Sequence, residues 1–433
     1  MKRIITFFLL IFCFATMSVN ATTQSDYTLN DYEINDRFED CIIINGVDVS
    51  IYQDTSSDWR LAKENGIDFA ILRVTLTTAE EGLLKIDKNF EEHFKNAKEA
   101  GIMCGVYVFS QAKNSEEARE EAEFAIYRLQ QLGIEPQDLD LPIYMDYEFY
   151  KKDESRLKNL SKYNAISSSR TFCETVAEYG YDAGVYANTS FMKSYLENGI
   201  FLPKGTSIWC AQYNIKNDSS SKYSIWQYSS HGIVPNIYSE GTDETKGVDV
   251  NFWFVDSSVN PSSKLDIYAE TNVQYTGQPV LPYVEIFDGT TQLVENEDYV
   301  IRGINNINIG SEAYAYIKGI NDYEGYALIP INIQNNFPQL PLPITSLKTS
   351  YKFRDSIISE VDDDTLIEDF LSNVKLDSDG YSLEVLDSQC NIKMPNEVVE
   401  FSDMVGVFKD AQLIGTIEIN LKSETQINYL IRR

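Results

Sequence analysis

Two acidic residues, Asp146 and Glu148, stand at the end of the apolar run Leu141–Glu148. On a strand, side chains two positions apart point to the same side, so both carboxyl groups would face one way. When two carboxyl groups are neighbours, the pKa of one is raised, and that group can act as a general acid. Glycoside cleavage needs this division of labour between two carboxyl groups. The spacing alone is more often found at a solvated strand end or in a salt-bridge pair.

A second pattern, Gly-Val-Asp-Val, occurs at both ends of residues 46–254. It places Asp48 in Gly46–Ser50 and Asp249 in Gly247–Asn251. Either aspartate by itself could lie on an edge strand and face water. The first and last strands of a closed barrel are neighbours, however, so the two aspartates could meet at one rim. The agreement of three segments therefore indicates an acidic site.

The elements that would position these residues alternate between short apolar strands and helical patterns. The predicted helices cover residues 58–65, 89–100, 115–132, 164–179 and 188–197. Strands that alternate with helices predict a parallel sheet, and eight strands can close into a barrel. The last three strands lack helices, so the barrel would be irregular. An open doubly wound sheet is the alternative, but its glycine-rich phosphate-binding motif is absent. The eight predicted strands are Gly46–Ser50, Asp68–Thr75, Met103–Ser110, Leu141–Glu148, Asp182–Asn188, Ser207–Tyr213, Ser224–Ser230 and Gly247–Trp253.

Aromatic side chains, some beside an amide, recur where these strands end. Aromatic rings stack on sugar faces, and glutamine can hydrogen-bond to hydroxyl or acetamido groups. Ordinary barrel packing is the alternative explanation. The candidate substrate-binding residues are Tyr107, Phe109, Tyr186, Trp209, Gln212, Tyr213, Trp226 and Tyr228.

Composition excludes several kinds of protein. The formal net charge of −30 argues against nucleic-acid binding, which requires a basic face. The two histidines, His93 on a helix and His231 in a loop, are expected at the surface and form no metal-binding set. No serine or cysteine has a plausible nearby base. We therefore expect no metal and no cofactor.

The first 21 residues resemble a secretory signal peptide. Lys2 and Arg3 precede an apolar run at 4–14, and small residues end the segment at 19–21. No other stretch is long and apolar enough to cross a bilayer. We therefore expect a secreted protein, extracellular or associated with the cell wall. The remaining cysteines show no pairing pattern, so free thiols are expected.

Two β-rich modules are expected after the barrel. Residues 264–335 show the alternation of a small sandwich, and residues 345–425 combine several strands with one helix at 364–372. Segments rich in serine or proline separate the parts. The sequence does not decide whether these modules are spacers or bind the cell wall.

In its ordered motifs, the first part of the chain resembles glycoside hydrolase family 25, the Chalaropsis-type lysozymes. The likeness spans residues 45–255. It is carried by Gly46–Ser50 with Gln53 and Trp59, Asp87 with Phe90, Gly101 to Phe109, Leu141–Glu148, Val185-Tyr186, Trp209–Tyr213, Trp226–Ser229 and Gly247–Asn251.

This resemblance implies a catalytic domain at 40–257 with an irregular (β/α)5β3 barrel, similar to a TIM barrel. It implies cleavage of the β-1,4 bond between N-acetylmuramic acid and N-acetylglucosamine in peptidoglycan, the expected partner. Glu148 would be the general acid, and Asp146 would orient or stabilise the substrate's acetamido group. Asp48 and Asp249 would support the site by hydrogen bonding. The second step could use the acetamido group or a carboxylate as its nucleophile.

Departures from the family pattern lie at the rim. The family often has Tyr-His-Phe where this chain has Tyr107-Val108-Phe109, and Lys-Ala-Thr-Glu-Gly where it has Arg73-Val-Thr-Leu-Thr-Thr.

The alternative functions are a catalytically weak wall-binding or adhesion protein on the same barrel and a chitin-cleaving glycosidase. Residues 265–334 resemble bacterial Ig-like surface repeats. Cleavage of soluble fragments is expected to survive removal of residues 260–433.

Overall fold

The computed structural model describes residues 22–23, 32–149, 156–234, 237, 247–257, 265–334, 347–354, 357–362, 365–376, 380–387, 391–400, 403–409 and 412–421. The predicted signal peptide at residues 1–21 lies outside this part of the chain. Two compact units are present. One is Val19–Asn335, and the other contains Asn336–Arg433.

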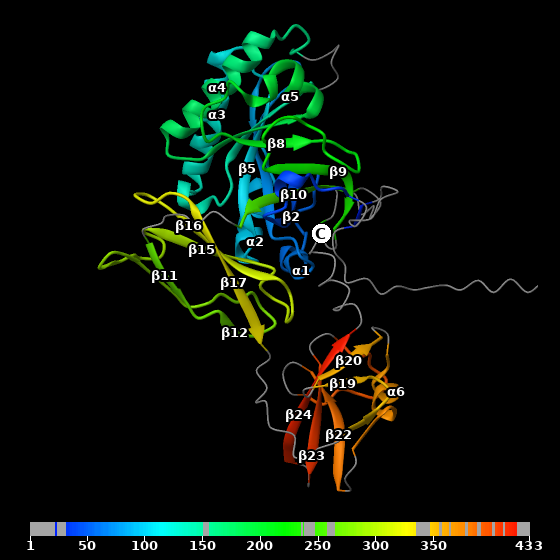
Figure 1. Ribbon diagram of the computed structural model, residues 1–433. Coiled ribbons are helices and arrows are strands. Elements are labelled where there is room, and N and C mark those ends of the chain that lie inside the picture. The colour runs from blue at the N-terminus through cyan, green and yellow to red at the C-terminus, as the bar shows by residue number, and fades with distance from the viewer. Residues whose placement is uncertain are drawn as a thin grey trace, which may run out of the picture. The chain divides into compact units, whose positions relative to one another are not determined.

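Eight strands of the first unit close into a barrel (Figure 1). From β2 to β9 the neighbouring barrel strands are parallel, and β10 is antiparallel to both β9 and β2. The eight predicted strands are confirmed, and the sheet is closed rather than open. Two short strands lie outside the ring, β1 (Thr22–Thr23) beside β9 and β4 (Leu84–Ile86) beside β3. The barrel strands are β2 (Cys41–Val49), β3 (Phe69–Thr77), β5 (Met103–Ser110), β6 (Ile143–Tyr147), β7 (Ala183–Asn188), β8 (Ser207–Ala211), β9 (Ile225–Ile233) and β10 (Val248–Asp256).

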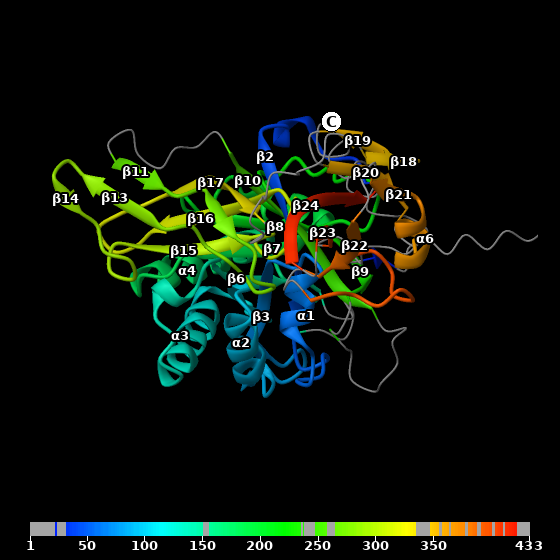
Figure 2. The same cartoon turned by 90° about the horizontal axis from the view of Figure 1, so that it is seen from below.

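Five helices connect the earlier strands, as the pattern predicts. Figure 2 shows α1, α2 and α3 along the outside of the barrel. Asp58 begins α1 by accepting a hydrogen bond from the Leu61 amide. Gly133 follows α3 with a φ of 69°, a conformation that glycine adopts without steric cost. Within the described residues, no helix lies between β8 and β10. The helices are α1 (Trp59–Glu64), α2 (Phe90–Glu99), α3 (Ser115–Gln131), α4 (Lys162–Glu178) and α5 (Thr189–Tyr195), with short 3-10 turns η2 (Asp36–Phe38), η3 (Pro136–Asp138) and η4 (Glu197–Gly199).

Alternation along each strand separates two hydrophobic clusters. On β2, Val47 and Val49 join the outer cluster with the helices, whereas Ile44 joins the cluster inside the barrel. Asp48 lies between the two valines and therefore shares the inner face with Ile44. Large apolar side chains fill the interior, so a charged residue can remain there only where the packing ends.

The expectation that both histidines are exposed surface residues is wrong for His93. Its side chain is 1% exposed, and its Nδ1 accepts a hydrogen bond from the Trp59 indole at 3.3 Å. Its Nε2 lies 3.2 Å from the Gln53 carbonyl oxygen. Burial lowers the pKa of His93 and favours the neutral imidazole. His231 is exposed but lies in β9, not in a loop.

Residues 265–334 form two small sheets around one core. The larger sheet joins β15 to β17, with β12 parallel to β17. Ile286 from the smaller sheet and Ile301 and Ala315 from the larger sheet belong to one buried cluster. This arrangement is a two-layer sandwich, as the alternation predicts. The sheets comprise β11 (Leu265–Ala269), β13 (Val284–Asp288) and β14 (Thr291–Gln292), and β12 (Asn272–Gln274), β17 (Tyr326–Gln334), β16 (Ala313–Gly319) and β15 (Tyr299–Ile304).

The larger sheet of this sandwich packs against the barrel. Ile304 and Tyr316 belong to the same buried cluster as the barrel's interior residues Ile44 and Phe69. The ring of Tyr316 meets Trp253 of β10 edge to face at 5.6 Å. In β2, Ile44 precedes Asp48 by four residues on the same inner face, so the sandwich covers the end of the barrel opposite Asp48.

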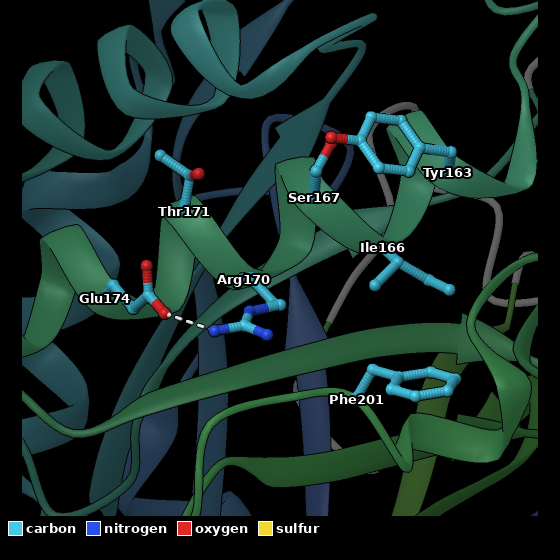
Figure 3. A pocket seen from close by; sticks show the side chains of 7 residues that line it. All are labelled: Tyr163, Ile166, Ser167, Arg170, Thr171, Glu174 and Phe201. Atoms are coloured by element: carbon cyan, nitrogen blue, oxygen red, sulfur yellow. Dashed lines mark hydrogen bonds and ion pairs between the residues drawn. The ribbon is translucent and has the colours of Figure 1, made fainter.

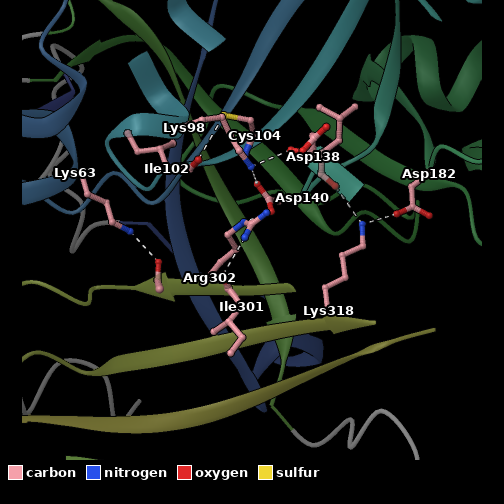
Figure 4. A network of polar contacts seen from close by, with 12 residues as sticks. Lys63, Lys98, Ile102, Cys104, Asp138, Asp140, Asp182, Ile301, Arg302 and Lys318 are labelled. Atoms are coloured by element: carbon pink, nitrogen blue, oxygen red, sulfur yellow. Dashed lines mark hydrogen bonds and ion pairs between the residues drawn. The ribbon is translucent and has the colours of Figure 1, made fainter. Parts of the chain in front are cut away.

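Ion pairs surround this apolar contact (Figure 4). Lys63 pairs with Asp68 at 2.6 Å, both side chains are at most 2% exposed, and the lysine also donates to the Gly303 carbonyl oxygen at 2.8 Å. Arg302 donates to Asp140 at 2.5 Å. A buried charge that loses its partner is strongly destabilising. Lys63 and Asp68 pair within the barrel and Asp140 also pairs with Lys98, so the sandwich adds further partners to charges that the barrel already pairs.

The second unit contains the C-terminal module. A five-stranded sheet and a two-stranded sheet share a core with the helix α6 (Ile367–Ser372), which corresponds to the helix predicted at 364–372. In the part of the chain that the structure describes, no helix is long and apolar enough to cross a membrane. The sheets comprise β19 (Lys352–Arg354), β20 (Ile357–Val361), β24 (Gln412–Leu421), β23 (Met404–Lys409) and β22 (Tyr381–Leu386), and β18 (Leu347–Thr349) with β21 (Val374–Leu376).

The contact between barrel and sandwich predicts different outcomes for two truncations. A chain of residues 22–335 should melt at the temperature of the barrel in the whole protein. A chain of residues 22–260 should melt roughly 5 °C lower or more, because Trp253 becomes exposed and Asp140 loses Arg302. Calorimetry of the two chains checks this expectation. Equal melting temperatures would show that the sandwich is only a spacer and that removal of residues 260–433 is harmless.

Candidate active site

All four predicted carboxylates come to one end of the barrel. Asp48 is the penultimate residue of β2, Asp146 is the penultimate residue of β6, and Glu148 directly follows β6. Asp249 is the second residue of β10, which runs antiparallel and therefore begins at this same end. The charges of Asp48, Glu148 and Asp249 all act on Asp146, so the four groups form one electrostatic cluster.

Asp48 is the hydrogen-bonding centre of this cluster. It is 6% exposed, and its Oδ2 accepts hydrogen bonds from Gln227 Nε2 and Asn251 Nδ2, each at 2.8 Å. A further side-chain hydrogen bond joins it to Asp249, its direct partner across the β2–β10 pairing. These donors come from β9 and β10, so closure of the barrel brings them to β2.

Asp249 is the proton donor of this pair. Burial, the charge of Asp48 and the hydrogen bond to Asp48 all raise the pKa of Asp249. Burial raises the pKa of Asp48 to about 6, and its hydrogen bonds oppose that rise. Asp249 therefore holds the shared proton more strongly than Asp48 and donates it in the hydrogen bond to the Asp48 carboxylate.

Asp146 has an oxygen without a protein partner. The side chain is 7% exposed, and its Oδ1 makes no hydrogen bond with any residue that the structure describes. Burial raises the pKa of Asp146, the charge of Glu148 raises it further, and Arg73 opposes this rise. A buried acceptor without a donor is costly unless a ligand supplies one. Asp146 can therefore accept a hydrogen bond from a bound molecule.

Glu148 lies at the outer edge of the cluster and is partly buried. Burial raises its pKa, and the charge of Asp48 raises it further. A carboxyl group with a raised pKa holds its proton closer to neutral pH and can donate it to a leaving group. The arrangement thus supplies a proton donor at Glu148 and a hydrogen-bond acceptor at Asp146.

Three of the predicted substrate-binding aromatics lie inside the barrel. Tyr107, Tyr186 and Trp209 are buried in the interior cluster. The Tyr186 hydroxyl donates to Gln227 Oε1 at 2.8 Å, and Trp209 Nε1 donates to Asn251 Oδ1 at 2.8 Å. These two hydrogen bonds orient the amides that donate to Asp48.

Two other predicted aromatics are more accessible than these three. Phe109 is partly buried, and Tyr213 is 56% exposed with its hydroxyl donating to Gln227 Oε1 at 2.7 Å. The ring of Tyr213 is therefore open to a ligand while its hydroxyl is fixed beside the carboxylate cluster.

The structure places Trp226 and Tyr228 in buried packing positions and joins the Gln212 side chain to Asp218. Trp226 and Tyr228 are each 1% exposed and pack in the outer cluster, where Tyr228 stacks on Phe252 at 4.0 Å. Alternation on β9 turns Gln227, not its aromatic neighbours, toward the interior. The Gln212 side chain is held by Asp218, to which its Nε2 donates at 2.7 Å.

Sequence reasoning missed the roles of Gln227, Asn251, Arg73 and Tyr52. The amides of Gln227 and Asn251 are used inside the protein and are not offered to a ligand. Arg73 pairs with Asp87 at 2.7 Å, and the 66% exposed ring of Tyr52 lies 5.5 Å from its guanidinium carbon. Alternation along β3 and β9 could have placed Arg73 and Gln227 inside. Nothing in the sequence indicates that Tyr52 lies over Arg73.

The family model described as glycosyl hydrolases family 25 matches residues 47–237. This range contains Asp48, Asp146 and Glu148, and Asp249 lies beyond it. Residues 47–237 form a family 25 glycosyl hydrolase domain.

A curated relative supports the same assignment. The family 25 domain is similar to the autolytic lysozyme of Clostridium acetobutylicum, with 27% identity over 192 residues. The matched region covers 44% of this chain and 52% of that protein, so the chain spans about half the length of this relative.

Solved structures show weaker similarity. The modular autolysin LytC of Streptococcus pneumoniae, determined in complex with a synthetic peptidoglycan ligand, is 22% identical with a TM-score of 0.43, over 54% of this chain and 52% of that one. The spore cortex lytic enzyme SleM of Clostridium perfringens is 19% identical with a TM-score of 0.43, over 69% of this chain and all of the other, 100%. The assignment of the domain therefore depends on the sequence matches.

The family 25 domain also carries a surface cavity that none of the four clustered carboxylates lines (Figure 3). Seven residues line it, six from α4 and Phe201, and none of them is a predicted site residue. Arg170 and Glu174 in its wall pair with each other at 3.1 Å. The described residues also contain no cluster of three or more histidine, cysteine or acidic side chains placed to hold a metal ion.

A buried glutamate joins the ends of two strands beside the site. Glu121 of α3 accepts hydrogen bonds from Thr77 at 2.6 Å, Ser110 at 2.5 Å and the Gln111 amide at 3.0 Å. Thr77 ends β3, Ser110 ends β5 and Gln111 follows it. The Gln111 side chain donates to the Glu148 carbonyl oxygen at 3.4 Å. Burial raises the pKa of Glu121 to about 7.

This raised pKa predicts a pH-dependent stability. The pKa of Glu121 is about 7 in the folded chain against an ordinary value of 4.5. Its contribution to the free energy of unfolding is therefore complete below the ordinary value and is lost as pH rises to about 7. Glu121→Gln should remove this pH-dependent loss of stability. Denaturant unfolding between about pH 4 and pH 8 measures the effect. The exposed Glu120→Gln on the same helix is the control, and an unchanged slope in Glu121→Gln would refute the expectation.

Proposed function

We propose that this protein is an N-acetylmuramidase that hydrolyses the β-1,4 bond between N-acetylmuramic acid and N-acetylglucosamine in peptidoglycan. The observation that carries this proposal is the placement of Asp146 and Glu148 on one inner face, at the rim of a family 25 glycosyl hydrolase domain. The family gives the reaction class. The similarity to an autolytic lysozyme supports peptidoglycan as the substrate.

In the proposed mechanism, Glu148 donates its proton to the glycosidic oxygen as the bond breaks. Its raised pKa keeps this proton available at the pH of the reaction. Asp146 offers Oδ1 to the N–H of the substrate's acetamido group and orients the acetamido oxygen toward the anomeric carbon. A retaining reaction then proceeds through that oxygen or through a carboxylate nucleophile.

Asp48 and Asp249 support this reaction without contacting the bond that breaks. Their shared proton and the two amide donors fix the carboxyl groups beside Asp146. Fixed dipoles of this kind stabilise developing charge without reorganising during the reaction. Tyr213 and Tyr52 present open rings at the rim and are proposed to stack on sugar units.

The segments outside the catalytic domain are proposed to bring that domain to the cell wall. Lys2, Arg3 and the following apolar run support secretion through a signal peptide. The sandwich at 265–334 is proposed to be Ig-like, and residues 345–425 to be a further surface module. The proposed barrel type, with five strand–helix units followed by three strands, agrees with the order of the described elements.

The first test is digestion of purified peptidoglycan and of chitin by residues 22–433, with mass spectrometry of the products. Glu148→Gln should lower turnover by roughly 10²–10⁴-fold because the general acid is lost. The exposed Glu174→Gln on α4 is the matched control. Fragments with a reducing N-acetylmuramic acid end, made by wild type and control only, support the proposal. If the wild type binds peptidoglycan without cleaving it, the result would favour a wall-binding protein. If it cleaves chitin alone, the result would favour a chitin-cleaving glycosidase.

Asp146→Asn tests the second carboxyl group. An amide can still accept a hydrogen bond, but it carries no charge to stabilise the positive charge that develops on the sugar or the acetamido group. Turnover should fall by roughly 10²-fold or more with little change in KM. Steady-state kinetics on soluble fragments checks this, with circular dichroism to establish folding. Wild-type turnover in Asp146→Asn would exclude the proposed role.

A further inference from the structure

We propose that the outer face of the smaller sandwich sheet is a second glycan-binding site, which holds a chain of uncharged sugar units. This inference goes beyond the proposed function, because it concerns binding by a module outside the catalytic domain and requires no cleavage. We call this surface the aromatic face. It is formed by Tyr268, Tyr283, Glu285, Phe287 and Gln292.

Alternation along β13 turns two of these aromatic rings away from the core. Val284 and Ile286 belong to the buried cluster of the sandwich. Their neighbours Tyr283, Glu285 and Phe287 therefore point outward. Figure 2 shows β11, β13 and β14 at the outer edge of the first unit.

A third ring joins them from β11. Tyr268 is the partner of Glu285 in the β11–β13 register, so it lies on the same outward side. Its ring meets Phe287 edge to face, with the centroids 6.0 Å apart. Tyr268 and Tyr283 are each 61% exposed, and Phe287 is partly buried. Tyr283 and Phe287 are four residues apart on an extended chain, roughly 14 Å, so the rings span more than one sugar unit.

A carboxylate lies among these rings. The Tyr283 hydroxyl donates to Glu285 Oε1 at 2.9 Å, and Gln292 Nε2 donates to the same oxygen at 3.5 Å. Glu285 Oε2 accepts no hydrogen bond from the residues that the structure describes, so it can accept one from a hydroxyl or acetamido group of a ligand. Single exposed tyrosines are ordinary on strands. Apolar rings grouped around a few oriented polar groups are instead the composition of a ligand site.

The charge of this surface selects the kind of ligand. Asp266 and Glu270 are exposed on the same side of β11 as Tyr268, and residues 265–301 contain no lysine or arginine. The aromatic face therefore repels polyanions, including phosphate-bearing polymers. An uncharged sugar chain complements it, because such a chain presents O–H and N–H donors beside apolar ring faces. The outer face of the larger sheet already contacts the barrel through Tyr316, so the smaller sheet is the one open to a ligand.

Calorimetric titration with the N-acetylglucosamine hexamer tests the proposal. The protein is residues 22–433 with Glu148→Gln, so that bound glycan is not cleaved. Tyr268→Ala and Tyr283→Ala in this chain should each weaken one binding event roughly tenfold or more, because a stacking ring is lost. Tyr163→Ala, which removes a 79% exposed tyrosine of α4, is the matched control and should change nothing. Any binding event from the carboxylate site of the barrel should be the same in all of these chains.

Several outcomes would overturn the proposal. One is equal titration by all four chains, and another is the absence of any binding event that the two alanine variants weaken. Binding of the glucosamine hexamer alone, lost at high salt, would show recognition of positive charge instead of stacking on sugar faces. A dimer that Tyr268→Ala converts to a monomer would show that the face joins two copies of the chain.

Two further measurements keep these outcomes distinct. Circular dichroism establishes that each variant is folded, and if Tyr268→Ala is not, the titration of Tyr283→Ala decides. Digestion of peptidoglycan by the wild type is measured separately. Its failure would remove the proposed function, but it would leave the titrations and their meaning unchanged.

Discussion

The hydrogen bond between Asp48 and Asp249 crosses the seam where β10 closes the barrel against β2. Closure of the barrel and assembly of the carboxylate site both depend on the register between β2 and β10. Because side chains alternate, a shift of β10 by one residue would turn Asp249 and Asn251 toward the helices. Asp48 would then lose two of its hydrogen-bonding partners, and Trp209 would lose its own. The register that closes the barrel thus also assembles the site.

Several carboxyl groups in one buried place repel each other, and the structure reduces this cost in three ways. Asp249 and Asp48 share a proton, the amides of Gln227 and Asn251 donate to the ionised partner, and Arg73 supplies a positive charge. What remains is a set of carboxyl groups with raised pKa values in different surroundings. Such a difference lets one group hold a proton while another stays charged.

The opposite end of the barrel has a different requirement. Its apolar interior must be covered, and in this chain the sandwich covers it with Ile304 and Tyr316. Buried ion pairs such as Lys63 with Asp68 lie around this contact. The sandwich therefore keeps a core of its own, while its outer face completes the barrel's interior cluster. This division leaves the carboxylate end open and the other end closed.

The sequence by itself determined the local elements and the carboxylates. Strands and helices were predictable because hydrophobic period and helix ends are local properties, and Asp48, Asp146, Glu148 and Asp249 recurred at strand ends. The tertiary structure decided which neighbours each side chain meets. Trp226 and Tyr228 proved to be packing residues because the inward direction on β9 falls on Gln227. His93, Arg73 and the sandwich face at Ile304 likewise depend on contacts between segments far apart in the chain, which no local pattern records.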